Sequence, residues 1–239
     1  MICGSHNGQP EHVAAVEGLV AKFGLDAGLL TRGQQWSRDR PTMVDQARSL
    51  DQPASIHNNC SGKHAGMLAL STVIGAGQHG YAAITHPVQQ TIIGTLEAMV
   101  GLDLMAFPHG IDGCGAPALS APLGNWARGF ALFAGGGELP AGRTAACARV
   151  RDGIAAAPRL IAGDRRLCTA LASGFGERMT AKIGAEGVYG CAFHEFGLGA
   201  MVKARGGNAR AGEAAIAALI HALGYDLPAD VSALAMPRL

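Results

Sequence analysis

Residues 187–203 read GVYGCAFHEFGLGAMVK, in which the turn-like segment HEFGL separates two short apolar runs. The runs cover residues 187–193 and 199–203. Short apolar runs separated by a glycine-containing segment are typical of an antiparallel strand pair. A strand pair alone is marginally stable in water and leaves unpaired backbone groups at its edges. The pattern therefore predicts an α+β protein whose sheet is incomplete without further strands.

Helical periodicity dominates the rest of the chain, with apolar residues three or four positions apart and glycine or proline at the ends of the segments. The glycine-rich residues 135–142 interrupt this pattern, and we expect them to form a loop between two lobes. Helices are expected over residues 10–23, 60–75, 87–100, 145–157, 166–175 and 211–223.

The composition indicates a folded protein with a small uncharged or zwitterionic partner. The chain has 239 residues, of which 49% are hydrophobic, which is enough for one substantial core or two small lobes. Its 19 basic and 18 acidic residues give a net charge of +1 without long blocks of one sign, which argues against a nucleic-acid partner. No apolar run approaches the roughly 18 residues that a membrane span requires.

The N-terminal sequence MICGSHNGQPEH lacks the basic and apolar stretches of a secretory signal. We therefore expect a cytoplasmic location, where cysteines are thiols and not disulfides. The six cysteines are widely and irregularly spaced, unlike those of a zinc finger. Any metal site must then gather its ligands from distant segments.

The stretch HNNCSGKHAGML is the sharpest local motif, because Asn58 or Asn59 can cap a helix that starts near Cys60. The helix dipole and Lys63 would both favour the thiolate form of Cys60, which predicts a lowered pKa and a nucleophile or metal ligand. Spacing alone makes Cys60 and His64, four residues apart, the natural metal-binding pair. The structural alternative is a buried core cysteine.

The stretch GIDGCGAP, which starts at residue 110, brings glycine backbone close to an acid and a thiol. If the segment is extended, Asp112 and Cys114 point to the same side. Asp112 could then accept hydrogen bonds from an ammonium group, and Cys114 could join Cys60 at a metal. The alternative is a tight turn that contains a turn-forming aspartate.

Ser5, in the opening motif CGSHNGQPEH, is a candidate nucleophile if a base lies close to it. The candidate base is Lys182 in AKIGAEGVYG, a lone lysine followed by apolar residues and then a strand, where loss of solvent would lower its pKa. The structural alternatives are a serine that only enters a helix or turn and a lysine that reaches solvent.

Five separated motifs occur in one order along the chain: CGSHNGQPEH, HNNCSGKHAGML, GIDGCGAP, PRLIAGDRRLCT and AKIGAEGVYG. Together they resemble the asparaginase II family, the rhizobial-type L-asparaginases, over nearly the whole chain. Each motif alone is weak, but their shared order makes the resemblance specific. It implies a fold similar to serine β-lactamases and glutaminases, with an antiparallel sheet flanked by helices and a helical lobe. It also implies hydrolysis of L-asparagine to L-aspartate and ammonia.

The resemblance implies roles for individual residues. Ser5 and Lys182 correspond to a catalytic pair, in which the lysine activates the serine for attack on the side-chain amide. It also implies a zinc ion that positions the substrate, with a neutral amine among its ligands. The residues implied around zinc and substrate are the zinc ligands Cys60, Lys63 and Cys114, the substrate-binding residues Asp112 and Cys168, and His64 as a neighbour of the ligands or a substrate contact.

The family pattern also includes an upstream Arg-Ser-x-x-Lys-Pro segment, whose serine and lysine form a second pair in the site, and a closing strand beyond the final LAMPRL. We therefore expect residues 1–239 to be a single domain that lacks its N-terminal and C-terminal segments and has an incomplete sheet. Little or no asparaginase activity is expected of this chain on its own. Full activity would show the second pair to be dispensable.

Two other functions fit the same residues. One is a non-catalytic zinc- or thiol-binding protein that keeps Cys60 and Cys114, and the other is a glutaminase or a β-lactam-processing enzyme of the same fold. Zinc content and turnover of asparagine, glutamine and a β-lactam would separate them. The resemblance further implies a homodimer.

Overall fold

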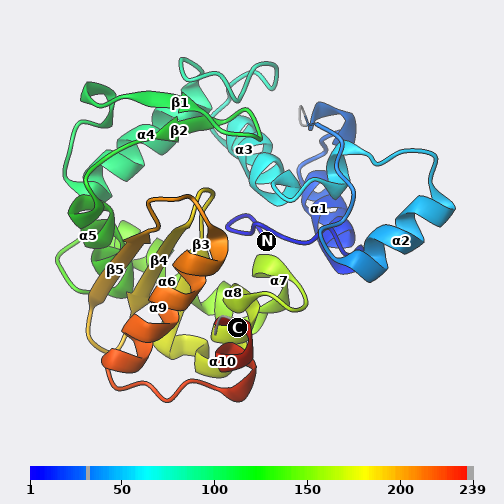
Figure 1. The fold of residues 1–239 in the computed structure, drawn as a ribbon. Helices are drawn as coiled ribbons and strands as arrows, with labels where there is room; N and C mark the ends of the chain where they lie inside the picture. The colour runs from blue at the N-terminus through cyan, green and yellow to red at the C-terminus, as the bar shows by residue number, and fades with distance from the viewer. Residues whose placement is uncertain (31–32, 236–239) are drawn as a thin grey trace. The chain divides into compact units, whose positions relative to one another are not determined.

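The computed structural model describes residues 1–30 and 33–235 (Figure 1). The chain divides into two units, each assembled from three segments. Unit 1 comprises Met1–Thr95, Leu104–Ser120 and Leu160–Asp164, and unit 2 comprises Leu96–Asp103, Ala121–Arg159 and Arg165–Leu239. Of the helices in the described part of the chain, none combines the length and apolar character required to cross a membrane.

Local sequence signals explain the helices of unit 1. The first, α1, begins with a proline and is followed by Gly24, whose positive φ of 63° is the left-handed conformation that glycine adopts readily. At the start of α2, the Asp39 carboxylate accepts a hydrogen bond from the Thr42 N–H at 3.2 Å. The helical elements are α1 (Pro10–Lys22), α2 (Arg40–Ser49), α3 (Ser61–Val73) and α4 (Pro87–Val100), which continues into unit 2, and the 3-10 helices η1 (Ala27–Leu29), η2 (Ser55–His57) and η3 (Leu104–Ala106).

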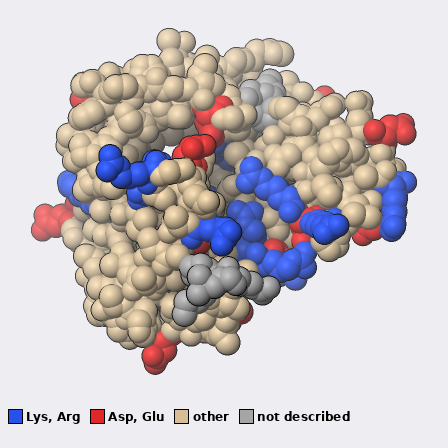
Figure 2. Space-filling view, viewed as in Figure 1, with Lys and Arg blue, Asp and Glu red and all other residues tan. Residues whose placement is uncertain are grey.

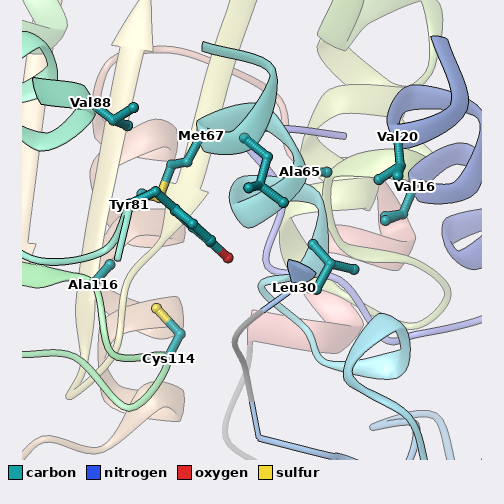
Figure 3. Close-up of a cluster of buried hydrophobic side chains, with 10 residues drawn as sticks. Val16, Val20, Leu30, Ala65, Met67, Tyr81, Val88, Cys114 and Ala116 are labelled. Carbon is teal, nitrogen blue, oxygen red and sulfur yellow. The ribbon is translucent and has the colours of Figure 1, made fainter. Parts of the chain in front are cut away.

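The core of unit 1 forms where α1 packs on α3 (Figure 3). Figure 3 shows α3 between the α1 valines and the ring of Tyr81. The cluster also includes Cys114, only 5% exposed, so this residue is anchored at the edge of the core. The buried members of the cluster are Val16, Val20, Leu30, Ala65, Met67, Leu68, Tyr81, Val88, Cys114 and Ala116.

A short hairpin supplies the segment that carries Cys114. Strands β1 (His109–Ile111) and β2 (Pro117–Leu119) pair antiparallel, with His109 opposite Leu119 and Ile111 opposite Pro117. The five residues between the strands form a tight turn. The GIDGCGAP segment is therefore not extended over its whole length, as the first of the two expectations required. The segment does form a turn, and Asp112 and Cys114 nevertheless lie on the same side of it.

Unit 2 contains a three-stranded antiparallel sheet in the order β3-β4-β5. The strands are β3 (Met179–Ile183), β4 (Val188–Phe193) and β5 (Leu198–Lys203). The central strand β4 is almost entirely buried, which accounts for its continuous apolar sequence. Lys182 on β3 pairs with Gly190 on β4. The prediction therefore located two strands correctly but missed β3, because it placed Lys182 before a strand and not within one.

Helices pack around this sheet, and α5 lies against β5. A side chain at Gly199 on β5 would clash with the Ala127 carbonyl oxygen on α5, so glycine permits this close approach. The helical elements of unit 2 and its boundaries are α5 (Leu123–Ala134), α6 (Ala141–Ala156), α7 (Arg159–Ala162), α8 (Leu167–Phe175), η4 (Gly176–Arg178), α9 (Ala209–Ala222) and α10 (Ala229–Ala235).

The mixed α+β class with small, open antiparallel sheets and flanking helices is as predicted. The expectation that residues 135–142 link two lobes is wrong, because this loop joins α5 to α6 within unit 2. Whether the two units form one domain over residues 1–239 stays a prediction. On the face shown in Figure 2, most of the surface is uncharged and both charge signs occur in small groups, in keeping with a charged fraction of 15%.

Candidate active site and metal centre

Ser5 lies in an extended segment that backbone hydrogen bonds hold on both sides. Its N–H donates to the Ile161 carbonyl at 3.0 Å, and the His6 N–H donates to the Asn59 carbonyl at 3.1 Å. A side chain at Gly4 would come within 2.8 Å of the Met1 carbonyl oxygen, so this tightly packed turn requires glycine. Ser5 is half-buried between buried neighbours, and its hydroxyl accepts a hydrogen bond from Asn59 Nδ2 at 3.0 Å.

Cys60 is the N-cap residue of α3, immediately before the first helical residue. Its backbone N–H donates to Asn58 Oδ1 at 2.9 Å, which fixes the start of the helix. Asn59 Nδ2 lies 3.5 Å from Cys60 Sγ. Lys63, in the first turn of α3, forms an ion pair with Asp112, with Nζ 3.3 Å from Oδ2. The start of α3 therefore carries a thiol and an ammonium group toward the hairpin turn.

The hairpin turn places an acid and a second thiol side by side. The Asp112 N–H donates to the Ala116 carbonyl at 2.8 Å, and the turn closes through Gly115, whose φ is 77°. The Asp112 carboxylate accepts hydrogen bonds from the Gly113 N–H at 2.8 Å and from Cys114 Sγ at 3.1 Å. This local network fixes the direction of both side chains.

These two segments bring three potential metal donors together in unit 1. One ligand atom from each of Cys60, Asp112 and Cys114 lies within 4.8 Å of the other two. Two thiolates and a carboxylate are ligands that suit zinc, and Lys63 contacts the same carboxylate. The donor set therefore fits a metal ion such as zinc, and the Lys63 amine lies beside it, 3.3 Å from the Asp112 carboxylate.

Lys182 and Cys168 lie close together in unit 2. Lys182 Nζ donates to the Ile183 carbonyl at 2.5 Å. The adjacent Ile183 N–H donates to Cys168 Sγ at 3.2 Å, and this sulfur also lies 2.9 Å from the Tyr189 hydroxyl. Since Ser5 and the three donors belong to unit 1, the approach of Lys182 and Cys168 to them stays a prediction.

A family model for L-asparaginase II matches residues 1–238. The chain belongs to the L-asparaginase II family. It is therefore an asparaginase-type amidohydrolase with asparagine as its small-molecule substrate. A comparison with curated protein sequences found no match.

In this member of the L-asparaginase II family, the two clustered thiols do not ionise as the sequence suggested. A hydrogen bond from Cys60 lowers the pKa of Cys114, and His64 and Lys63 lower it further. Burial acts in the opposite direction but is outweighed. The same bond to Cys114, together with burial, raises the pKa of Cys60. The predicted acidic Cys60 is therefore wrong, because its partner thiol outweighs the helix terminus and Lys63.

Lys63 also departs from the neutral amine that zinc ligation would require. Burial lowers its pKa, but the charges of Cys60, Cys114 and Asp112 together raise it above the usual value. Lys63 is thus a cation beside this cluster, and it could become a ligand only if it loses its proton to an arriving metal.

His64 is fully buried behind the candidate ligands, and its Nδ1 lies 2.9 Å from the Tyr81 hydroxyl. It also contributes to the lowered pKa of Cys114. This position fits a neighbour of the ligands and not the direct ligand that helical spacing first suggested.

Asn59 is the residue whose place in the site the sequence analysis missed. It was considered only as a helix cap, but Asn58 provides the capping contact to Cys60. The sequence signal for a second role was the pair of asparagines before Cys60. One asparagine is enough to cap the helix, so the amide of the other can bond elsewhere.

Proposed function

We propose that the site of this chain serves the hydrolysis of L-asparagine to L-aspartate and ammonia, with Ser5 as nucleophile and Lys182 as its base. Full ammonia release by the wild-type chain would also show the second serine–lysine pair to be dispensable. The family match supports the reaction class. The observation that carries the assignment of Ser5 is its hydrogen bond to Asn59, which joins its hydroxyl to the Cys60 end of the donor cluster. One amide thus links the half-buried Ser5 hydroxyl to a cluster in which Asp112 and Lys63 could bind the charged groups of a zwitterionic amino acid.

The reaction requires two acyl-transfer steps. Ser5 Oγ attacks the side-chain carbonyl carbon of asparagine while its proton passes to the neutral amine of Lys182. The carbon–nitrogen bond then breaks, and the lysine returns the proton to the leaving nitrogen, which departs as ammonia. Water attacks the resulting ester, its proton passes to Lys182 and then to Ser5 Oγ, and aspartate leaves.

The proposed substrate contacts follow from the charges around the hairpin turn. The Asp112 carboxylate is about one-third exposed, so it can accept hydrogen bonds from the α-ammonium group of asparagine in place of Lys63. His64 and Cys168 are proposed to complete the site, His64 through its support of Cys114 and Cys168 from beside Lys182.

Zinc is the proposed metal, held by Cys60 and Cys114 with Lys63 as the third ligand that the family resemblance implies and Asp112 as its competitor for that position. When bound, it would supply positive charge that orients the polar groups of the substrate. A cytoplasmic homodimer is the proposed working form, which light scattering during gel filtration would test.

Replacing the proposed catalytic pair tests this function directly. Ser5→Ala and Lys182→Ala should each lower asparagine-dependent ammonia release by about 1000-fold or more, because each removes a group that takes part in bond formation. Ser71→Ala is the matched control, since Ser71 is a buried serine whose hydroxyl donates only within α3, to Leu68. Full activity of Ser5→Ala would refute the proposal.

A metal-binding protein without turnover is the second candidate, and the Cys60, Asp112 and Cys114 group favours it. Stoichiometric zinc without ammonia release from asparagine would support this function. A glutaminase would instead release ammonia faster from glutamine, although the extra methylene changes selectivity by only about 1–3 kcal/mol.

A further inference from the structure

The side chain of Asn59 bridges two groups of the candidate site. Its Nδ2 lies 3.0 Å from Ser5 Oγ and 3.5 Å from Cys60 Sγ. A side-chain amide nitrogen carries two hydrogens, so it can donate to both atoms at once. Asn59 therefore joins the candidate nucleophile to the candidate metal ligand within unit 1.

The backbone of Asn59 is held on both sides, which fixes the origin of its side chain. Its carbonyl accepts from the His6 N–H at 3.1 Å, and its N–H donates to Gln35 Oε1 at 3.4 Å. The neighbouring Asn58 has a different task. Its Oδ1 accepts from the Cys60 N–H, and its Nδ2 donates to the Gly33 carbonyl at 3.0 Å. The side chain of Asn58 thus holds the backbone, whereas the side chain of Asn59 contacts Ser5 and Cys60.

A donor to Ser5 Oγ has a specific chemical consequence. It occupies one lone pair of the oxygen, so the hydroxyl proton must point away from Asn59 and toward another acceptor. It also stabilises negative charge on the oxygen while the proton leaves, because hydrogen bonds to charged groups are stronger than those to neutral ones. Asn59 would therefore increase the reactivity of Ser5 without contacting the substrate.

We propose that Asn59 is a positioning residue that orients Ser5 Oγ for attack and ties it to Cys60 through the two hydrogens of one amide. This inference rests on the proposed role of Ser5 as nucleophile. Asn59 looks like a helix cap in the sequence, but it would take part in the reaction through Ser5.

The discriminating replacement is Asn59→Asp, because aspartate has nearly the same shape but no hydrogen to donate when ionised. Asn59→Leu removes the polar group altogether at similar size. Asn208→Asp is the matched control: Asn208 is an exposed N-cap residue of α9 whose Oδ1 accepts from the Arg210 N–H, and aspartate caps equally well.

A phosphonofluoridate probe can report on Ser5 in the full chain independently of asparagine turnover. The Ser5 oxygen forms a bond to phosphorus, the phosphorus–fluorine bond breaks, fluoride leaves and the hydroxyl proton passes to a base or to water. Peptide mass spectrometry locates the adduct, and Ser5→Ala shows the background. Because the lost bond is one to a developing charge, both Asn59 variants should react about 10- to 100-fold more slowly than wild type, and Asn208→Asp at the wild-type rate.

A second readout separates positioning from general damage. Asn59→Asp should lower kcat for asparagine with KM changed less than about threefold, since the lost bond acts on Ser5 and not on bound substrate. Unchanged circular dichroism and zinc content would accompany this loss.

The proposal is overturned if wild type and Asn59→Asp react equally with the probe, whether both are labelled at Ser5 or neither is. Slower labelling of the variants in a protein that releases no ammonia supports the role of Asn59 and refutes the proposed asparaginase activity. Equal ammonia release by wild type and both variants supports the proposed asparaginase activity and refutes the role of Asn59.

Discussion

The two units bury different kinds of side chain. Of the twelve buried polar residues in the described part of the chain, eleven belong to unit 1, and Thr180 belongs to unit 2. Unit 2 instead buries apolar and aromatic side chains around its sheet, such as Phe193, whose ring lies 5.7 Å from that of Tyr225. The residues that gather into the metal-binding cluster also belong to unit 1.

This difference shows where specific geometry is needed. A buried polar group costs free energy unless it finds a partner, so each one in unit 1 restricts its neighbours to an arrangement that provides one. His6 shows this restriction, because its Nδ1 accepts from the Gly8 N–H at 3.1 Å and its Nε2 must then donate to Ser61 Oγ, also at 3.1 Å. Unit 2 packs by apolar fit, which tolerates more substitution.

The largest expected effect is on metal binding by unit 1. Cys114→Ser and Cys60→Ser should each weaken zinc binding by roughly 1000-fold or more, because structural zinc sites share about 10–16 kcal/mol among four ligands. Competition with a chromophoric chelator measures this loss. Cys147→Ser is the control, since Cys147 is a buried cysteine of α6 in unit 2. Undiminished zinc affinity in both cluster variants would contradict the proposed site.

A core truncation in unit 2 tests whether the two kinds of packing are independent. Phe193 is fully buried in β4, so Phe193→Ala should lower the free energy of unfolding by about 3–5 kcal/mol. Hydrogen exchange measured by mass spectrometry should show faster exchange in β3, β4 and β5, with α1 and α3 less affected. Equal acceleration in both units would instead support the single cooperative domain predicted over residues 1–239.

Two serines of the same helix test the polar network of unit 1. Ser61 and Ser71 are both fully buried in α3, but Ser61 contacts the His6 ring whereas Ser71 donates to the Leu68 carbonyl within the helix. Ser61→Ala should cost about 1–3 kcal/mol in metal-free protein, because it removes the hydroxyl that contacts a buried imidazole nitrogen.

Ser71→Ala is the comparison, and its expected cost is under about 1 kcal/mol, since the helical hydrogen bonds remain. Urea unfolding of both variants gives the difference. Equal destabilisation would show that the His6–Ser61 contact has no special weight in unit 1.

The sequence predicted helices where an apolar stripe coincides with clear end signals, but it missed the buried strand β3 and the helix α5, which packs on β5. The helices α1, α3 and α4 were found to within about two residues, because their apolar residues recur at helical spacing between proline and glycine signals. α2 was missed because none of its residues is buried, so it has no apolar stripe. Its available signal was the cap, with Asp39 ahead of a proline near the first turn.

For the site, residue types were predictable and pairings were not. The sequence identified Cys60, Asp112 and Cys114, and the structure brings them together. It assigned the lowered pKa to Cys60 and not to Cys114, because the outcome depends on a hydrogen bond between residues 54 positions apart. Asn59 was missed for the same reason, since its contact with Ser5 crosses a similar span.

The smallest expected effect concerns an exposed ion pair of unit 2. Arg178 and Glu195 lie 2.9 Å apart, and the hydrogen bond from Arg178 lowers the pKa of Glu195. A carboxyl group with a lowered pKa stabilises the folded state above its unfolded pKa, and this contribution is lost as pH falls through the folded value. Glu195→Gln should therefore be slightly less stable than wild type at pH 7 and equally stable in strong acid.

A double-mutant cycle with Arg178→Gln isolates this contribution, because Arg178 also stacks on the Tyr225 ring, 5.0 Å from its centroid. The coupling between the two substitutions should be present at neutral pH and decrease with added salt, since both side chains are exposed. A coupling that persists unchanged in strong acid would mean that residues 178 and 195 are coupled through Tyr225, which stacks on Arg178 and whose hydroxyl donates to Glu195 at 3.0 Å, and not through the carboxylate charge. In that case even the exposed edge of unit 2 would depend on aromatic packing, which would sharpen its contrast with the hydrogen-bonded interior of unit 1.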